Sequence, residues 1–285
     1  MSRLLYISNL GKQIQYIEKV VATYPELLQG EVDLCNMKKP PQWDADFESR
    51  LRAADVVLVT NMGVGLDSPF LERLERWLYA HHPKYWIDVV EPKKTDILYR
   101  NLDEDKRVLL ESYRRTSGVM NYVRLINGAF STKPTSEWEE PDPIPWQAIM
   151  GREGNIYETY DEFMDAEGHR DWPSIAVYFY RDEWIMGDIE YQQALFEEIY
   201  KHQYNPIIFY GQYGSNPRVG IPNMKLSMNH LFGKDEFPFD VLINTCKFSF
   251  QSLGAQTLEE LKLQDVPIVQ GYTIYMDEKS WAENP

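Results

Sequence analysis

The chain has 285 residues, of which 44% are hydrophobic and 26% are charged. These values are typical of globular proteins, and the length suits one large domain or two ordinary ones. The formal net charge of −15 disfavours nucleic acid and anionic membrane surfaces, so we expect neither as a partner.

Cysteine content and apolar runs exclude further classes of protein. Cys35 and Cys246 are the only cysteines, which excludes a disulfide framework and a cysteine zinc site. The apolar run at the N-terminus is too short for a signal peptide, and no run reaches membrane-spanning length. We therefore expect a cytoplasmic protein.

The first half of the chain alternates apolar runs with amphipathic segments. The predicted elements are, in chain order, a strand at 4–7, a helix through Ile14 to Val21, a strand at 32–35, a helix around Phe47 and Leu51, a strand at 55–60, a helix starting at Ser68–Pro69, and a strand at 85–90. Such a series predicts a parallel, doubly wound sheet.

The middle of the chain changes character. Residues 102–130 are charged, helical in pattern and carry an irregular apolar face, whereas 133–145 are rich in Pro, Ser, Thr and acidic residues and are typical of a linker. Residues 146–168 carry aromatic side chains that we expect to pack against a domain surface.

The second half opens on its clearest pattern, from Pro173 to Gly211. A β-branched and aromatic run, a polar turn at 181–183, an amphipathic segment and a second apolar run predict a βαβ unit with buried parallel strands. The predicted elements of this half are strands at 174–180, 206–210, 239–245 and 266–270, helices at about 188–203 and 255–263, and a long loop at 214–234 with one short helix.

Together these patterns predict an α/β protein with two Rossmann- or flavodoxin-like parallel-sheet domains and an intervening helical segment. The predicted divisions are an N-terminal domain with its helical extension at 1–132, a linker and packing segment at 133–172, and a second domain at 173–285. A cleft between the two halves is the expected ligand site.

One candidate site follows the strand at 55–60. The sequence NMGVG at residues 61–65, which contains Asn61 and Gly63, lies between a predicted strand and a predicted helix. Backbone N–H groups in such a turn can hold a phosphate or carboxylate. The pattern is neither a P-loop nor G-x-G-x-x-G. The glycines equally suit an ordinary tight turn with positive φ.

Two further candidates lie at predicted strand ends of the second half, where ligands of parallel sheets bind. Tyr180 and Arg181 end one strand, and the arginine can bind a carboxylate through two hydrogen bonds or pair with a nearby acidic residue. Asn244 and Thr245 end another predicted strand, and their position makes them candidate ligand-binding residues for the same reason.

Metal and acid–base chemistry have no clear candidates. The five histidines show neither H-E-x-x-H nor H-x-H spacing, so we expect no pre-formed zinc site and assign no metal ligand. No pair of carboxylates is distinctive against such an acidic background. We therefore assign no catalytic residue.

Several segments of the second half occur in an order and spacing typical of one family. They are Phe179–Tyr180–Arg181, Asn205–Pro206, the run from Phe239 to Thr245, the run from Asp265 to Gln270, and the tail Trp281 to Pro285. From about Tyr157 onward the chain resembles the large subunit of ATP-dependent cobaltochelatase and magnesium chelatase. It departs from the family at Glu158–Thr159, where members often carry His-Pro.

This resemblance implies a function in inserting cobalt or magnesium into a tetrapyrrole. It implies a tetrapyrrole substrate, and AAA+ ATPase partner subunits that carry the ATP and Mg; the absence of a Walker motif here agrees with that division. It places this chain at the beginning of a longer subunit, so we expect a segment that binds substrate or partners, with no cofactor and no catalysis of its own.

Two other classes remain open. One is a non-catalytic two-domain module that closes on a small anionic ligand. The other is a glycosyltransferase-like enzyme with two facing domains, for which Gly211–Gly214 is a poor nucleotide-diphosphate site. The choice between cobalt and magnesium, between metal insertion and removal, and the oligomeric state are left open by the sequence.

Overall fold

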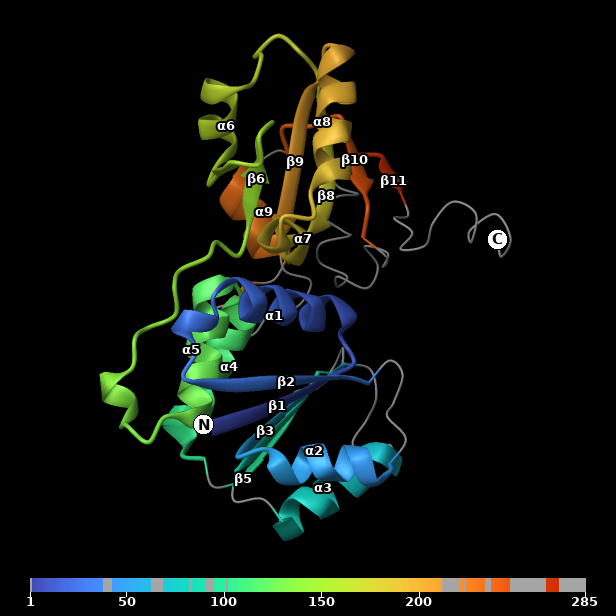
Figure 1. Cartoon of the computed structure of the whole chain (residues 1–285). Coiled ribbons are helices and arrows are strands. Elements are labelled where there is room, and N and C mark those ends of the chain that lie inside the picture. The colour runs from blue at the N-terminus through green and yellow to red at the C-terminus, as the bar shows by residue number, and fades with distance from the viewer. Residues whose placement is uncertain are drawn as a thin grey trace. The chain divides into compact units, whose positions relative to one another are not determined.

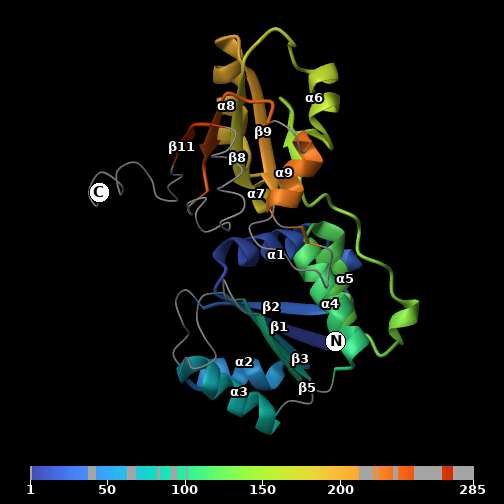
Figure 2. The ribbon, with the colours of Figure 1, turned by 180° about the vertical axis from the view of Figure 1, so that it is seen from behind.

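The computed structural model describes residues 2–37, 43–62, 69–81, 84–90, 95–100, 102–211, 221–222, 224–233, 237–246 and 265–271. The chain divides into two compact units, Met1–Ile144 and Pro145–Pro285, which are described separately (Figures 1 and 2). The division lies inside the segment 133–172, so the part of that segment from Pro145 onward belongs to the second unit.

The first unit is built on a five-stranded sheet with the order β2-β1-β3-β4-β5. Its strands are β1 (Ser2–Ser8), β2 (Gly30–Asn36), β3 (Val56–Met62), β4 (Tyr85–Val90) and β5 (Thr95–Arg100). The first four are parallel, and their order is that of flavodoxin-like sheets. β5 was not predicted. It runs antiparallel to β4 because the connection 91–94 is too short for a crossover.

Helices cover both faces of this sheet (Figure 1). They are α1 (Gly11–Thr23), α2 (Ala45–Ala53), α3 (Pro69–His81), α4 (Glu104–Thr116) and α5 (Val119–Phe130), with short 3-10 turns at Pro25–Leu27 and Thr135–Glu137. α2 and α3 pack on the face that carries Leu5 and Ile7, and α1 and α5 lie on the opposite face. Leu4 and Tyr6 alternate with these two residues and are equally buried, so the sheet is covered on both sides.

The irregular apolar pattern of residues 102–130 has a structural reason in α4. Arg107 and Glu111 are buried, and the arginine Nη1 donates to the glutamate Oε2 at 3.0 Å. Arg115 Nε donates to Glu111 Oε1 at 2.8 Å. The helix therefore buries an ion-pair network where the periodicity alone predicts apolar side chains.

The second unit contains a six-stranded sheet with the order β11-β10-β8-β9-β6-β7. Its strands are β6 (Ala148–Met150), β7 (Ile156–Tyr157), β8 (Ser174–Tyr180), β9 (Asn205–Gly211), β10 (Val241–Asn244) and β11 (Ile268–Gln270). β8 to β11 are parallel, as predicted, and repeat the 2-1-3-4 order of the first unit. β6 and β7 extend the edge in antiparallel pairing, so the aromatic segment 146–168 supplies part of the sheet itself.

The helices described beside this sheet are α6 (Tyr160–Ala166), α7 (Arg181–Met186), α8 (Glu190–Lys201) and α9 (Met224–Phe232). α8 and α9 lie on opposite faces of the sheet (Figures 1 and 2). The turn predicted at 181–183 is wrong, because these residues open α7, which ends at Gly187 in the left-handed conformation with φ 72°. The helix predicted at 255–263 lies outside the described residues.

The α/β class with parallel-sheet cores is therefore confirmed, with three antiparallel edge strands as departures. No described helix combines the length and apolar character required to cross a membrane.

Candidate functional site

Each sheet has a topological switch point, where successive connections run to opposite sides of the first strand. The candidate residues predicted from the sequence lie next to these two points. In the second unit, β9 lies on one side of β8 and β10 on the other, so the switch point lies between the carboxyl ends of β8 and β10. Tyr180 is the last residue of β8 and Arg181 follows it; Asn244 is the last residue of β10 and Thr245 follows it. Open α/β sheets bind their ligands at this point. We call this margin the carboxyl edge of the second unit.

Arg181 lies beneath this edge and not on its surface. Only 2% of the residue is exposed, and its Nε donates to the backbone oxygen of Pro145 at 2.8 Å. Its guanidinium carbon lies 4.4 Å from the centre of the Trp146 ring. The side chain thus fixes the segment that enters β6, in place of the predicted contact with a ligand carboxylate.

A buried polar cluster surrounds Thr245. The carboxylate of Glu183 is 2% exposed and accepts from the hydroxyl of Tyr191 at 2.7 Å and from Nε2 of Gln192 at 2.9 Å. Thr245 Oγ1 lies 3.1 Å from the same tyrosine hydroxyl and donates to the backbone oxygen of Tyr178 at 2.8 Å. Glu183, Tyr191 and Thr245 thereby join α7, α8 and the end of β10. Burial raises the pKa of the Tyr191 hydroxyl.

Asn244 is fully buried and holds the end of β11. Its Nδ2 donates to Oε1 of Gln270 at 2.8 Å, and Nε2 of Gln270 returns a hydrogen bond to the Asn244 backbone oxygen at 3.0 Å. Cys246 follows and is fully buried; burial raises the pKa of its thiol, and the Glu183 carboxylate adds to the effect. This thiol is therefore protonated at neutral pH and is not an activated nucleophile.

Asn61 and Gly63 belong to the first unit. Asn61 is 1% exposed in the last part of β3, beside the switch point between β1 and β3. Gly63 lies outside the described residues. The structure therefore brings Arg181, Asn244 and Thr245 to one edge of the second unit, and it places Asn61 at the corresponding edge of the first.

Trp146 is the residue at this edge that sequence reasoning missed. Ala148 pairs with Tyr210 in the antiparallel β6–β9 ladder, so the residues before Ala148 continue past the carboxyl end of β9. The ring of Trp146 is half-buried and rests on Arg181. No local pattern reveals this position, because it depends on the pairing of β6 with a strand sixty residues later in the chain.

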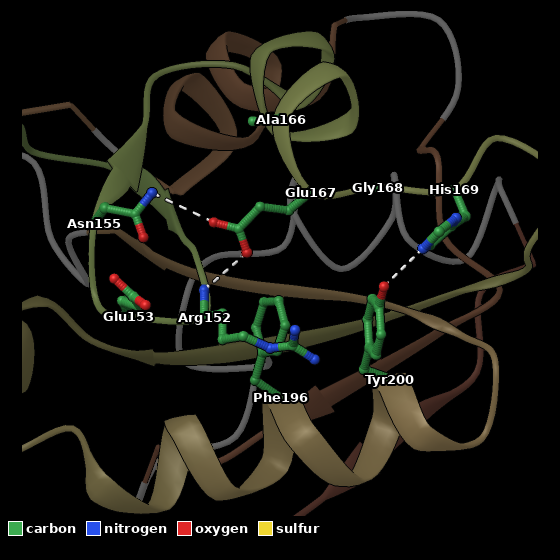
Figure 3. Close-up of a pocket in the computed structure, with 9 residues that line it drawn as sticks. All are labelled: Arg152, Glu153, Asn155, Ala166, Glu167, Gly168, His169, Phe196 and Tyr200. Atoms are coloured by element: carbon green, nitrogen blue, oxygen red, sulfur yellow. Dashed lines mark hydrogen bonds between the residues drawn. The ribbon is translucent and has the colours of Figure 1, made fainter.

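A separate pocket of about 470 Å³ lies beside α8 (Figure 3). Its lining residues are Arg152, Glu153, Asn155, Ala166, Glu167, Gly168, His169, Phe196 and Tyr200. They come from the turn after β6, the end of α6 and the outer face of α8. Across the residues that the structure describes, no three His, Cys, Asp or Glu side chains are arranged to hold a metal ion.

The two parallel-sheet cores with their covering helices define the chain as an α/β protein. The model of the CobN/Magnesium Chelatase family matches residues 111–285, which is more than half of the chain. The chain belongs to this family.

The proteins that are similar to the chain include one matched by sequence and one matched by structure. The "Uncharacterized protein MJ0908" of Methanocaldococcus jannaschii is 32% identical over an alignment of 186 positions that covers 60% of this chain and 15% of that protein. The catalytic subunit of cobaltochelatase from Mycobacterium tuberculosis matches in structure over 99% of this chain and 22% of its own, with a TM-score of 0.52 and 15% identity. The structural match to the cobaltochelatase subunit shows a shared fold. The chain spans less than a quarter of the length of either protein.

Proposed function

We propose that this chain forms part of the tetrapyrrole-binding large subunit of a metal chelatase, and that the carboxyl edge of its second unit contacts the macrocycle. The observation that supports this most strongly is the family match, which spans the whole second unit. The switch point in that unit is where an α/β sheet of this order binds a ligand.

The width and chemistry of the edge suit a flat ring. From β10 through β8 and β9 to β6 there are three inter-strand spacings, or about 14 Å. Trp146 and Tyr180 are half-buried aromatic residues along this margin, and a π-system stacks favourably on another ring. Thr245 and Asn244 complete the margin on the β10 side.

Arg181 has a positioning role in this proposal. Because it is buried and bonded to Pro145, it holds the ring of Trp146 toward the edge and does not bind a tetrapyrrole carboxylate itself. A buried charge is retained where its hydrogen bonds fix a geometry. The arginine thus contributes to binding through the tryptophan.

The wider reaction is also proposed. Cobalt or magnesium is the substrate metal, the insertion depends on ATP hydrolysed by AAA+ partner subunits, and the assembly works in the cytoplasm. The cobaltochelatase subunit that shares this fold is described as catalytic. Within it, the part that this chain represents is assigned to substrate binding and not to chemistry.

A titration tests the proposal. The chain is mixed with a metal-free porphyrin, with a cobalt-free corrinoid precursor, and with nucleotide sugars as the competing ligand class. We expect a saturable shift of the tetrapyrrole absorption band together with quenching of tryptophan fluorescence. A saturable response to nucleotide sugars alone would contradict the proposal and favour a glycosyltransferase-like protein.

Variants at the edge locate the binding surface. Tyr180→Ala and Trp146→Leu are expected to weaken tetrapyrrole binding by about threefold to tenfold each, since each removes one stacking contact of about 1 kcal/mol. Tyr79→Ala is the control, because this tyrosine is 66% exposed on α3 of the first unit. Equal tetrapyrrole affinities for all three variants would show that the carboxyl edge is not part of the binding site.

A further inference from the structure

The pocket beside α8 lies away from the carboxyl edge. Met150 pairs with Ile208 near the middle of β9, and the residues after Met150 continue toward the amino end of that strand. Asn205, the first residue of β9, fixes the loop that carries His169. The pocket is therefore a second site, and its ligand is independent of the function proposed above.

The floor of the pocket already holds a guanidinium group. Phe196 and Tyr200 are one helical turn apart on α8 and present their rings side by side (Figure 3). The guanidinium carbon of Arg152 lies 4.4 Å from the centre of the Tyr200 ring and 5.6 Å from that of Phe196. Its Nε contacts Oε1 of Glu197 at 2.6 Å. A cation over aromatic faces beside a carboxylate is a favourable arrangement.

One wall is a carboxylate with a fixed orientation. Glu167 accepts from the backbone nitrogen of Arg152 at 2.9 Å and from Nδ2 of Asn155 at 3.3 Å (Figure 3). It also accepts from the hydroxyl of Tyr157 at 2.7 Å. These three hydrogen bonds, from residues of the same unit, fix the position of the Glu167 carboxylate. Glu153 adds a second, exposed carboxylate to the lining.

A second part of the lining, next to Glu167, is aromatic and equally well held. Nε2 of His169 lies 2.8 Å from the hydroxyl of Tyr200, and its ring stacks on Trp172 with centres 4.0 Å apart. Asn205 Oδ1 accepts from the His169 backbone nitrogen at 2.8 Å, and its Nδ2 donates to the backbone oxygens of His169 and Trp172 at 2.9 and 3.0 Å. A ligand thus meets pre-organised walls.

The charge of the pocket selects the sign of its ligand. Three carboxylates, Glu153, Glu167 and Glu197, face a single resident cation, Arg152, and the whole chain carries a net charge of −15. The resident pair is partly exposed, with 44% of the Arg152 side chain and 57% of the Glu197 side chain accessible. The arginine contacts both carboxylate oxygens of Glu197, through Nε at 2.6 Å and Nη2 at 3.2 Å. Because both side chains are partly exposed to water, the pair is only modestly stabilising, and an incoming cation that takes over these contacts displaces the arginine.

We propose that this pocket binds an organic cation, a guanidinium or alkylammonium group, on the aromatic floor that Arg152 occupies in the unliganded protein. The cation stacks on Tyr200 and Phe196 and takes over the contact with Glu197, while Glu153 and Glu167 add attraction from the walls. The group arrives on a small amine or guanidine, or as a lysine or arginine side chain of a protein.

The test uses agmatine, which carries both a guanidinium and an ammonium group. Calorimetric titration of the whole chain is expected to give a saturable signal in the millimolar range or below. Trp172 stacks on the pocket wall, so its fluorescence changes with occupancy, and Trp172→Phe removes that change without removing the heat of binding. In Arg152→Ala the floor is vacant, and agmatine binds up to about fivefold more tightly.

Matched variants separate this site from general attraction to an acidic protein. Glu153→Gln is expected to weaken agmatine binding by about threefold, the size of one partly exposed charge contact. Glu158→Gln removes an exposed carboxylate of the same unit outside the pocket and leaves the affinity unchanged. Equal losses in the two variants would overturn the proposal.

Two further titrations complete the design. A short peptide with one arginine flanked by glycines distinguishes the source of the cation: tighter binding than agmatine indicates a protein side chain, and weaker binding a free amine. Acetate and inorganic phosphate are the opposing probes. Saturable binding of either anion, lost in Arg152→Ala, or no heat from agmatine with any variant, would show that the pocket is not a cation site. Neither result depends on tetrapyrrole binding.

Discussion

The carboxyl edge and the pocket beside α8 use similar side chains in opposite ways. Each contains an arginine against an aromatic ring at 4.4 Å, and each has a glutamate that accepts from a tyrosine hydroxyl at 2.7 Å. At the edge these groups are buried, since Arg181 and Glu183 are each 2% exposed. In the pocket, 44% of the Arg152 side chain is accessible.

This difference shows that residue type alone does not assign a binding role. A buried, hydrogen-bonded arginine holds its neighbours in place, because withdrawing it from its partners is costly. An exposed arginine with a solvent-accessible partner exchanges that partner readily. The four predictions below compare matched residues from the described part of the chain. The first three are in order of decreasing expected effect at neutral pH, and the fourth concerns alkaline pH.

The two arginines give the largest contrast. Arg181→Met is expected to lower the free energy of unfolding of the second unit by about 3 kcal/mol, because it leaves the Pro145 oxygen and the Trp146 ring without their buried partner. Arg152→Met is expected to cost less than about 1 kcal/mol. Urea unfolding followed by circular dichroism measures both values. Equal losses would break the distinction between the regions.

Two asparagines provide the second contrast. Asn205 is 1% exposed and its side chain bonds the loop at His169 and Trp172, so Asn205→Ala is expected to cost about 2 kcal/mol. The exposed Asn155 bonds Tyr157 and Glu167 at the pocket rim, and Asn155→Ala is expected to cost less than about 1 kcal/mol. The same unfolding experiment ranks the pair, and the reverse order would contradict it.

Two buried tyrosines on neighbouring strands give a smaller contrast. The Tyr178 hydroxyl donates to the Gly211 backbone oxygen at 3.2 Å, so Tyr178→Phe is expected to cost about 1 kcal/mol. The Tyr210 hydroxyl is buried and has no hydrogen-bond partner among the described residues, so Tyr210→Phe is expected to be neutral or slightly stabilising. Destabilisation by Tyr210→Phe would reveal an ordered partner for that hydroxyl.

The first unit extends the comparison to pH. Burial raises the pKa of the Tyr113 hydroxyl to about 12, and the group donates to the Glu139 backbone oxygen. The folded state therefore retains this proton more strongly than the unfolded state, whose tyrosine pKa is near 10. The stabilisation is complete below about pH 10 and is lost as the pH rises toward 12.

Tyr113→Phe tests this pH dependence directly. Between pH 9 and pH 12 the wild-type chain is expected to lose stability more steeply than the variant, as measured by urea midpoints at each pH. Tyr79→Phe is the control because Tyr79 is 66% exposed. Parallel curves for wild type and Tyr113→Phe would contradict the expected titration.

The parallel cores were predictable because buried parallel strands form nearly continuous apolar runs. The strands at 174–180 and 206–210 were found within a residue of β8 and β9 for this reason. β5, β6 and β7 were missed, since short antiparallel edge strands lack such runs. α7 was mistaken for a turn because Arg181–Asp182–Glu183 is a polar triplet between two stronger signals.

The sites were only partly predictable, because exposure and long-range pairing are not written in local patterns. Strand ends located Arg181 and Thr245 at the edge, yet nothing in their neighbours indicates that Arg181 points inward onto Trp146. The pocket combines Arg152, His169 and Tyr200 from three segments, and only the folded chain brings them together. Sequence reasoning therefore located the strand ends that we propose as a ligand site, and the structure shows which of their side chains are buried and which are partly exposed.

The most direct test of the account is the affinity of a metal-free tetrapyrrole for Trp146→Leu and Trp172→Leu, measured by the shift of the tetrapyrrole absorption band. If the macrocycle stacks on the tryptophan at the carboxyl edge, Trp146→Leu binds about tenfold more weakly than wild type, whereas Trp172→Leu stays within about twofold. Unchanged affinity in Trp146→Leu, or an equal loss in both variants, would contradict the assignment of the carboxyl edge as the tetrapyrrole-binding surface.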